Sequence, residues 1–234
     1  MRGDGNMIYI PSIMWAIAGA MIQACFIIVE HKEQYVPAVI LKGCASLLFI
    51  FIGLYGMNHA MDHSFAVLVF IGLIFGGIGD VLLNLRFVLK DIGQKVFLGG
   101  IAAFLIGHII YLSALISQSA SLLVSLIAGV VAAAGILFWI FKKITAKKVF
   151  KIFGIFYVGA VVLMTAVAIG NVITYPSSAA YWVYAFGAVA FTASDIILIF
   201  NTFSGEEPKY SMRIGNLSLY YLGQLLIAFS LQLM

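Results

Sequence analysis

The stretch from residue 65 to residue 85 reads FAVLVFIGLIFGGIGDVLLNL and carries one charged side chain, Asp80. Its length is close to the ~20 apolar residues with which an α-helix crosses the hydrocarbon core of a bilayer. Lipid offers no partners to backbone N–H and C=O groups, so only helices and closed barrels can cross it. A barrel strand would alternate apolar and polar residues, which this stretch does not. It therefore predicts a transmembrane helix with one ionisable side chain inside it.

The remainder of the chain continues this pattern. Of its 234 residues, 64% are hydrophobic and 9% are charged, and the mean hydropathy is +1.13. Such a composition excludes a soluble globular domain, which needs far more polar surface. We expect an all-α integral membrane protein in which about eight transmembrane helices form one domain over residues 1–234. The helices are expected near residues 8–29, 36–56, 65–85, 97–117, 122–141, 151–173, 179–202 and 216–233.

The first apolar segment, residues 8–29, is longer than the roughly 7–15 apolar residues of a secretory signal, so we expect it to remain as a helix. Met1 and Met7 both stay open as the biological start. Cys25 and Cys44 fall within apolar segments, where a structural disulfide is not expected. They are interpreted as small core residues.

Lysines and arginines predict the orientation, because positively charged loops stay on the cytoplasmic side. Lys42 lies inside a helix and Arg2 precedes the first one. The others fall in the four loops after the odd-numbered helices: Lys32; Arg86, Lys90 and Lys95; Lys142, Lys143, Lys147, Lys148 and Lys151; Lys209 and Arg213. Both termini are therefore expected outside the cytoplasm. The net charge of +4 is explained by this asymmetry and by anionic lipid, so nucleic-acid binding is not predicted.

Two acidic residues, Asp80 and Asp195, lie inside expected helices. An ionisable group in a membrane is costly enough that a functional role is the default hypothesis. The alternative is a structural ion pair or polar contact between helices. Lys42 is a candidate partner of either aspartate, or it extends to the interface. At 1.5 Å per residue, Lys42, Asp80 and Asp195 lie ~9, ~8 and ~10 Å from the cytoplasmic helix ends, which puts three charges at one level.

Weaker polar candidates lie at similar or greater depth. His108 and Tyr111 are one turn apart on one helix, and Gln224 follows Tyr220 and Tyr221 on the last. A buried hydrogen-bonded histidine and tyrosines that only pack are the alternatives. No metal site is predicted, because the sequence offers no convergent cysteine and histidine spacing.

A faint internal repeat aligns Asp80 with Asp195, Gly72 with Gly187, and GHIIYLS with GQLLIAFS further along. It predicts two parallel four-helix halves related by an axis along the membrane normal. The match is short, so a chance origin stays open.

Five helices carry polar motifs in a fixed order. They are K-x3-S at Lys42 and Ser46, GD-x-LL at residues 79–83, G-x3-F-x3-H-x2-Y at residues 100–111, GA-x2-F-x2-SD at residues 187–195, and YY-x2-Q at residues 220–224. In order and spacing this set resembles the YhhN family of membrane lysoplasmalogenases. The resemblance implies hydrolysis of the vinyl ether bond of lysoplasmalogen to a fatty aldehyde and glycerophosphocholine or glycerophosphoethanolamine. It implies Asp80 and Asp195 as the catalytic pair.

Vinyl ether hydrolysis suits two carboxyl groups, since a proton is delivered to carbon and water captures the resulting oxocarbenium ion. Asp80, among glycine and aliphatic residues, is our hypothesis for the acid, and Asp195, beside Ser194 and Thr192, for the base. The reverse assignment stays open.

Further substrate contacts are hypotheses, and no cofactor is expected. Lys42 and Arg86 would bind the phosphate, and Tyr111, Tyr221 and Gln224 would orient water or glycerol oxygens. The remaining substrate-binding candidates are Ser46, Asn84 and His108. The expected partners are a lysophospholipid substrate and membrane lipids. The site is expected to face the cytoplasmic leaflet, of the inner membrane in a bacterium or of the endoplasmic reticulum in a eukaryote.

A rival from another class is a small transporter or proton-coupled carrier that uses the two aspartates as proton or ion sites. Against it, all four prolines lie at helix starts or in loops, so no proline breaks a helix at mid-membrane: Pro11, Pro37, Pro176 and Pro208. A structural or regulatory membrane subunit ranks last, because it leaves the two intramembrane charges unexplained.

Overall fold

The computed structural model describes residues 9–234, so Arg2, the two candidate start residues and the first position of the first expected helix lie outside it. Within that range the chain forms eight long helices and two short 3-10 helices, and no strand. All eight are long and apolar enough to cross a membrane, which confirms the all-α integral membrane protein. The long helices are α2 (Ile10–His31), α3 (Tyr35–Met57), α4 (His63–Leu85), α5 (Gly93–Ser117), α6 (Leu122–Lys143), α7 (Lys148–Thr174), α8 (Ala179–Phe203) and α9 (Tyr210–Ser230); the short ones are η1 (Lys90–Ile92) and η2 (Leu231–Leu233).

The largest differences from the expected boundaries are at the starts of α9 and α5. Helix α9 begins at Tyr210 rather than at residue 216, and α5 at Gly93 rather than at residue 97. Polar residues occupy these first turns, so the apolar pattern begins later than the helix does. In α9 the early turn is held by Arg213, which forms a bidentate ion pair with Glu30 at the end of α2.

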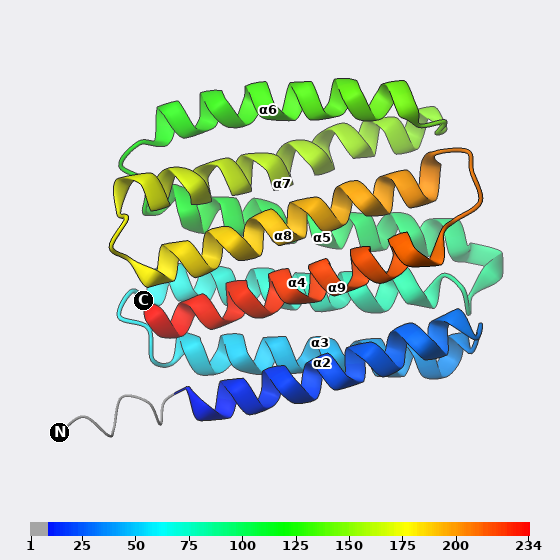
Figure 1. Cartoon of the computed structure of the whole chain (residues 1–234), viewed down its shortest axis with the longest axis horizontal. Coiled ribbons are helices and arrows are strands. Elements are labelled where there is room, and N and C mark those ends of the chain that lie inside the picture. The colour runs from blue at the N-terminus through cyan, green and yellow to red at the C-terminus, as the bar shows by residue number, and fades with distance from the viewer. Residues whose placement is uncertain (1–8) are drawn as a thin grey trace.

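Successive helices run antiparallel along the bundle axis (Figure 1). In this view α8, α9 and α2 form a front layer over α5, α4 and α3. Helix α7 packs on both α5 and α8, and α6 packs on α7 at the outer edge. The loops after α2, α4, α6 and α8 lie together at the end opposite the C-terminus (Figure 1), and we call this the basic end. Which side of the membrane it faces stays a prediction.

Two helix pairs approach each other closely at glycines. A Cβ on Gly107 of α5 would lie 3.2 Å from the carbonyl oxygen of Gly72 on α4. A Cβ on Gly223 of α9 would lie 2.9 Å from the carbonyl oxygen of Gly187 on α8, and a Cβ on Gly187 would lie 2.9 Å from that of Gly223. The internal repeat aligns Gly72 with Gly187 and Gly107 with Gly223, so equivalent glycines make equivalent contacts in both pairs. The division into two parallel four-helix halves stays a prediction.

The two cysteines differ from expectation. Cys25 and Cys44 are free and exposed, so the prediction that they are core residues is wrong. Each lies on the outer face of its helix, where the surrounding solvent is lipid. A thiol is apolar enough for that position, and an apolar sequence pattern does not separate a lipid-facing side from a core-facing side.

The glycine contact between α8 and α9 yields a stability prediction. We expect Gly187→Val to lower the thermal unfolding midpoint in detergent, because overpacking at a close backbone contact costs about 1–3 kcal/mol. The matched control is Gly159→Val on α7, where an added Cβ meets nothing within 4 Å. Tryptophan fluorescence measures the unfolding midpoints. Equal midpoints for the two variants would contradict the close contact.

Candidate active site

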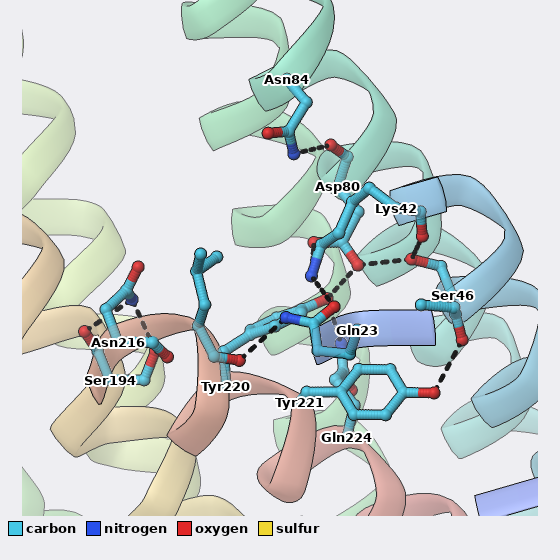
Figure 2. Close-up of polar contacts among 12 residues, drawn as sticks. Gln23, Lys42, Ser46, Asp80, Asn84, Ser194, Asn216, Tyr220, Tyr221 and Gln224 are labelled. Carbon is cyan, nitrogen blue, oxygen red and sulfur yellow. Dashed lines mark hydrogen bonds and ion pairs between the residues drawn. The ribbon is translucent and has the colours of Figure 1, made fainter. Parts of the chain in front are cut away.

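Asp80 lies where α3, α4 and α9 meet, and three side chains are directed at its carboxyl group (Figure 2). The ammonium of Lys42 is 3.3 Å from Oδ1. The hydroxyls of Ser46 and Tyr220 donate to Oδ2 at 2.6 and 2.8 Å. Asp80 is 3% exposed and Lys42 is 1% exposed. In such apolar surroundings a cation and two hydroxyl donors stabilise the ionised carboxylate.

Lys42 is itself held from several sides. Its ammonium donates to Gln23 Oε1 at 3.2 Å, and it lies 4.5 Å from the centre of the Tyr220 ring. Gln23 in turn donates to the carbonyl oxygen of Leu217 at 3.2 Å, which joins α2 to α9. The prediction that Lys42 is the partner of an aspartate is confirmed for Asp80. The alternative, that it extends to the interface, is wrong because the side chain is buried.

The Tyr220 hydroxyl is also held by a chain of hydrogen bonds that passes through Gln224 (Figure 2). Tyr111 on α5 donates to Gln224 Oε1 at 3.0 Å, and Gln224 Nε2 donates to the Tyr220 hydroxyl at 3.1 Å. Tyr221 points to the other side of α9 and donates to the carbonyl oxygen of Ala45 at 2.9 Å. These residues fix the position of the Tyr220 hydroxyl, which then contacts Asp80.

Asp195 on α8 has a different environment. The hydroxyl of Tyr157 on α7 donates to Oδ2 at 3.0 Å. Nε2 of His108 lies 3.8 Å from the same oxygen, and neither ring nitrogen of His108 has a hydrogen-bond partner within residues 9–234. Over the same residues Asp195 pairs with no lysine or arginine, and it is 4% exposed. The Asp195 carboxyl therefore has one hydrogen-bond donor, whereas the Asp80 carboxyl has a cation and two donors.

The residues chosen as polar neighbours of Asp195 do not contact its carboxyl group. Ser194 donates to the carbonyl oxygen of Asn216 at 2.9 Å, and Thr192 donates to the carbonyl oxygen of Ala188 at 3.0 Å. The premise for making Asp80 the acid and Asp195 the base is therefore wrong. Sequence neighbours on a helix point in different directions, and the partners of both carboxyls come from other helices. The assignment itself stays a prediction, and the contacts now favour its reverse.

Both carboxyl groups line one cavity, which encloses about 680 Å³ not filled by protein atoms, including the part open to solvent. Its lining combines polar and charged side chains with aliphatic and aromatic ones. Its walls are Lys42, Asp80, Leu83, Asn84, Phe97, Ile101, Phe104, Tyr157, Asp195, Leu198, Ile199, Thr202, Phe203, Arg213, Asn216, Leu217 and Tyr220. This arrangement can hold a molecule that has a polar part beside the carboxyls and an apolar chain.

Some of the predicted binding residues reach this cavity and others do not. Asn84 lines it, donates to the backbone oxygen of Asp80 at 2.8 Å, and has no partner for Oδ1 within the described chain. Ser46 and His108 are next to the aspartates without lining the cavity. Tyr111, Tyr221 and Gln224 lie behind its wall, and Arg86 lines a second cavity nearer the basic end.

Among the cavity residues that sequence reasoning missed, Tyr157 and Asn216 make hydrogen bonds within the site. Tyr157 lies in a helix for which the sequence indicated no polar site, and its hydroxyl could only be placed once α7 was packed against α8. Asn216 was read as the first residue of a helix that begins earlier, at Tyr210. It forms reciprocal hydrogen bonds with Ser194 and lines the cavity beside Tyr220 (Figure 2).

A metal centre has no ligand set here. Over residues 9–234 no group of three or more histidine, cysteine, aspartate or glutamate side chains is arranged to hold a metal ion. Hydroxyl, amide, ammonium and carboxyl groups are the chemistry that the cavity offers.

Comparisons with known proteins agree with the motifs. The sequence model described as the YhhN family matches residues 37–231. The human protein named lysoplasmalogenase TMEM86A is 27% identical over 188 residues, which cover 78% of this chain and 72% of the human protein. No solved structure matches the chain.

The buried pair of Lys42 and Asp80 yields a second stability prediction. We expect Lys42→Met to destabilise the folded protein by about 3–5 kcal/mol, because it leaves an uncompensated buried carboxylate. The double variant Lys42→Met with Asp80→Asn is expected to be less destabilised than Lys42→Met alone. Unfolding in detergent gives the free energy of unfolding of the single and the double variant. Lys143→Met on the exposed end of α6 is the control. Additive effects of the two substitutions would contradict the pairing.

Proposed function

The chain belongs to the YhhN family, and we propose that it is a hydrolase that cleaves the vinyl ether bond of 1-alkenyl lysophospholipids. The products are a fatty aldehyde and glycerophosphocholine or glycerophosphoethanolamine. The observation that carries the proposal is one membrane-embedded cavity with two carboxyl groups in opposite environments. The name of the human relative supports the same reaction class.

The reaction needs an acid first and a base second. Protonated Asp195 delivers its proton to the second carbon of the alkenyl group, and an oxocarbenium ion forms at the first carbon. Asp80, held ionised by Lys42, Ser46 and Tyr220, takes a proton from the water that attacks this ion. A hemiacetal results. The arrangement follows the logic of glycosidases, in which environment separates the roles of two carboxyl groups.

Collapse of the hemiacetal restores both groups. Its hydroxyl proton passes to the Asp195 carboxylate as the carbonyl of the aldehyde forms. The carbon–oxygen bond to glycerol breaks, and Asp80 returns its proton to the glycerol oxygen. Both carboxyl groups then have their initial protonation state, and one water has been consumed.

Other cavity residues position the reactants in this scheme. The unpartnered Oδ1 of Asn84 accepts a hydrogen bond from water or from a glycerol hydroxyl. Tyr157 orients the Asp195 carboxyl through its hydrogen bond. The alkenyl chain lies along Phe97, Ile101 and Ile199. If the basic end faces the cytoplasm, as the lysines and arginines predict, a single-chain lipid approaches from the cytoplasmic leaflet.

The test is aldehyde release by purified protein supplied with 1-alkenyl lysophospholipid. We expect turnover of the alkenyl lipid and none of the 1-acyl or 1-alkyl analogues, because only a vinyl ether is protonated at carbon. Asp80→Asn and Asp195→Asn should each reduce the rate by about 10²–10⁴-fold, the usual contribution of a general acid or base.

Each variant must first give the same elution volume and circular dichroism spectrum as the wild type. Lack of aldehyde release by folded wild-type protein across head groups and pH would overturn the hydrolase. Proton-coupled flux in liposomes would then test the transporter.

Tyr157 provides a separate test of how Asp195 is positioned. We expect Tyr157→Phe to lower kcat about 10- to 100-fold, since one hydrogen bond to a charged or reacting group contributes roughly 1.5–3 kcal/mol. It should also shift the pH–rate profile, because the hydrogen bond stabilises the ionised form of Asp195. Tyr184→Phe is the matched control, since that tyrosine is also buried and its hydroxyl has no partner in the described residues. Equal kinetics for both variants would contradict the role of Tyr157.

A further inference from the structure

A second cavity lies at the basic end and adjoins the catalytic one. It encloses about 1110 Å³ not filled by protein atoms, including the part open to solvent. Its walls come from the α2–α3 junction, the end of α4 and the α8–α9 junction: Glu30, His31, Glu33, Tyr35, Arg86, Phe87, Leu198, Asn201, Thr202, Pro208, Lys209, Tyr210 and Arg213. We call it the vestibule.

The vestibule and the catalytic cavity share three wall residues, Leu198, Thr202 and Arg213. On α8 the residues Asp195, Leu198 and Thr202 are spaced i, i+3 and i+7, so they lie on one helix face. That face runs from the catalytic carboxyl into the vestibule over ~10 Å, at a rise of 1.5 Å per residue. A single elongated molecule can therefore occupy both cavities.

The basic side chains of the vestibule differ in whether they form an ion pair with an acidic side chain. Arg213 pairs with Glu30, and Lys209 pairs with Glu206 at 2.9 Å. Arg86 forms no ion pair with any described residue, and its Nε is buried without a hydrogen-bond partner. Burial, with a smaller effect of the Arg213 charge, lowers the pKa of Arg86 to about 10, so it stays charged at neutral pH. An unpaired guanidinium between the rings of Phe87 and Phe97 suits an anion such as phosphate.

The acidic side chains of the vestibule also differ in whether they form an ion pair. Glu30 is paired, whereas Glu33 forms no ion pair over residues 9–234. Glu33 has a φ of 58°, the one positive value among the described non-glycine residues, which the tight α2–α3 junction requires. Aromatic rings lie beside it in the vestibule wall, where Tyr35 stacks on Phe87 with centroids 5.1 Å apart. A carboxylate with aromatic faces nearby suits an ammonium group.

We propose that the vestibule binds a zwitterionic glycerophospholipid head group, with the phosphate at Arg86 and the ammonium at Glu33 and the adjoining aromatic rings. This inference rests on the proposed function and adds its head-group specificity. The unpaired charges of the vestibule number one of each sign within the described chain, which is the complement of phosphocholine or phosphoethanolamine. Glu33 then discriminates against head groups that carry a phosphate alone.

Binding of three non-hydrolysable lipids tests the proposal: 1-alkyl-glycerophosphocholine, 1-alkyl-glycerophosphate and 1-alkylglycerol. Each displaces a fluorescent alkyl lysophosphocholine from protein in nanodiscs of neutral lipid. We expect Arg86→Gln to raise Kd for the two phosphate lipids about tenfold or more and to leave 1-alkylglycerol unchanged. We expect Glu33→Gln to weaken binding of the phosphocholine lipid alone, so that preference over the phosphate monoester is lost.

The controls are Lys90→Gln and Glu207→Gln, exposed charges outside the vestibule wall. Soluble glycerophosphocholine should compete better than inorganic phosphate, which separates a head-group site from a simple phosphate site. Unchanged Kd in both vestibule variants, equal losses for 1-alkylglycerol, or equal competition by inorganic phosphate would overturn the proposal. Failure of the hydrolase is distinguishable, because it appears as absent aldehyde release while the binding series still follows the expected order.

Discussion

The ion pair of Lys42 and Asp80 is the interaction on which the centre of the bundle depends. Two opposite charges taken out of water are tolerated only when their hydrogen-bonding capacity is met by other groups. Here those groups come from α2, α3 and α9: Gln23 for the ammonium, and Ser46 and Tyr220 for the carboxylate. Because Gln23 on α2 is bonded to the backbone of α9, and Tyr220 on α9 to Asp80 on α4, the pair fixes how these helices are rotated about their axes.

Close packing around this pair creates the asymmetry between the two aspartates. Glycines at the α4–α5 and α8–α9 contacts bring backbones together, and both aspartate side chains are almost fully buried. Away from bulk water, electrostatic differences between environments are large. Asp80 receives a cation and two donors, whereas Asp195 receives one donor from Tyr157. His108 lies near Asp195, and its ring nitrogens have no hydrogen-bond partner among the described residues. The chemistry proposed above follows from this difference rather than from the aspartates alone.

The sequence predicted most of the fold and some residues of the candidate site, but not their contacts. Eight apolar segments of bilayer length leave little choice of architecture, and Asp80, Lys42 and Asp195 were conspicuous because charges in a membrane are costly. Tyr157 was not, since one tyrosine among aliphatic residues looks the same whether it packs or donates. The wrong premise for assigning acid and base roles to the aspartates has the same origin. Helix rotation decides which side chains meet, and in an apolar helix both faces carry similar residues, as the exposed Cys25 and Cys44 also illustrate.

Arg86 and Arg213 both line the vestibule, but they differ in whether an acidic side chain neutralises them. Arg213 is neutralised by Glu30, so it closes the α2–α9 corner and forms a wall common to both cavities. Arg86 follows the last residue of α4, the helix that carries Asp80, and forms no ion pair with any residue of the described chain. The helix thus holds the Asp80 carboxylate and the Arg86 guanidinium at a fixed spacing of six residues, or ~9 Å along the axis. Under the proposed function, a lipid whose phosphate binds Arg86 would have its ether oxygen held at a set depth in the bundle, and head-group binding would then align the vinyl ether with the carboxyl groups.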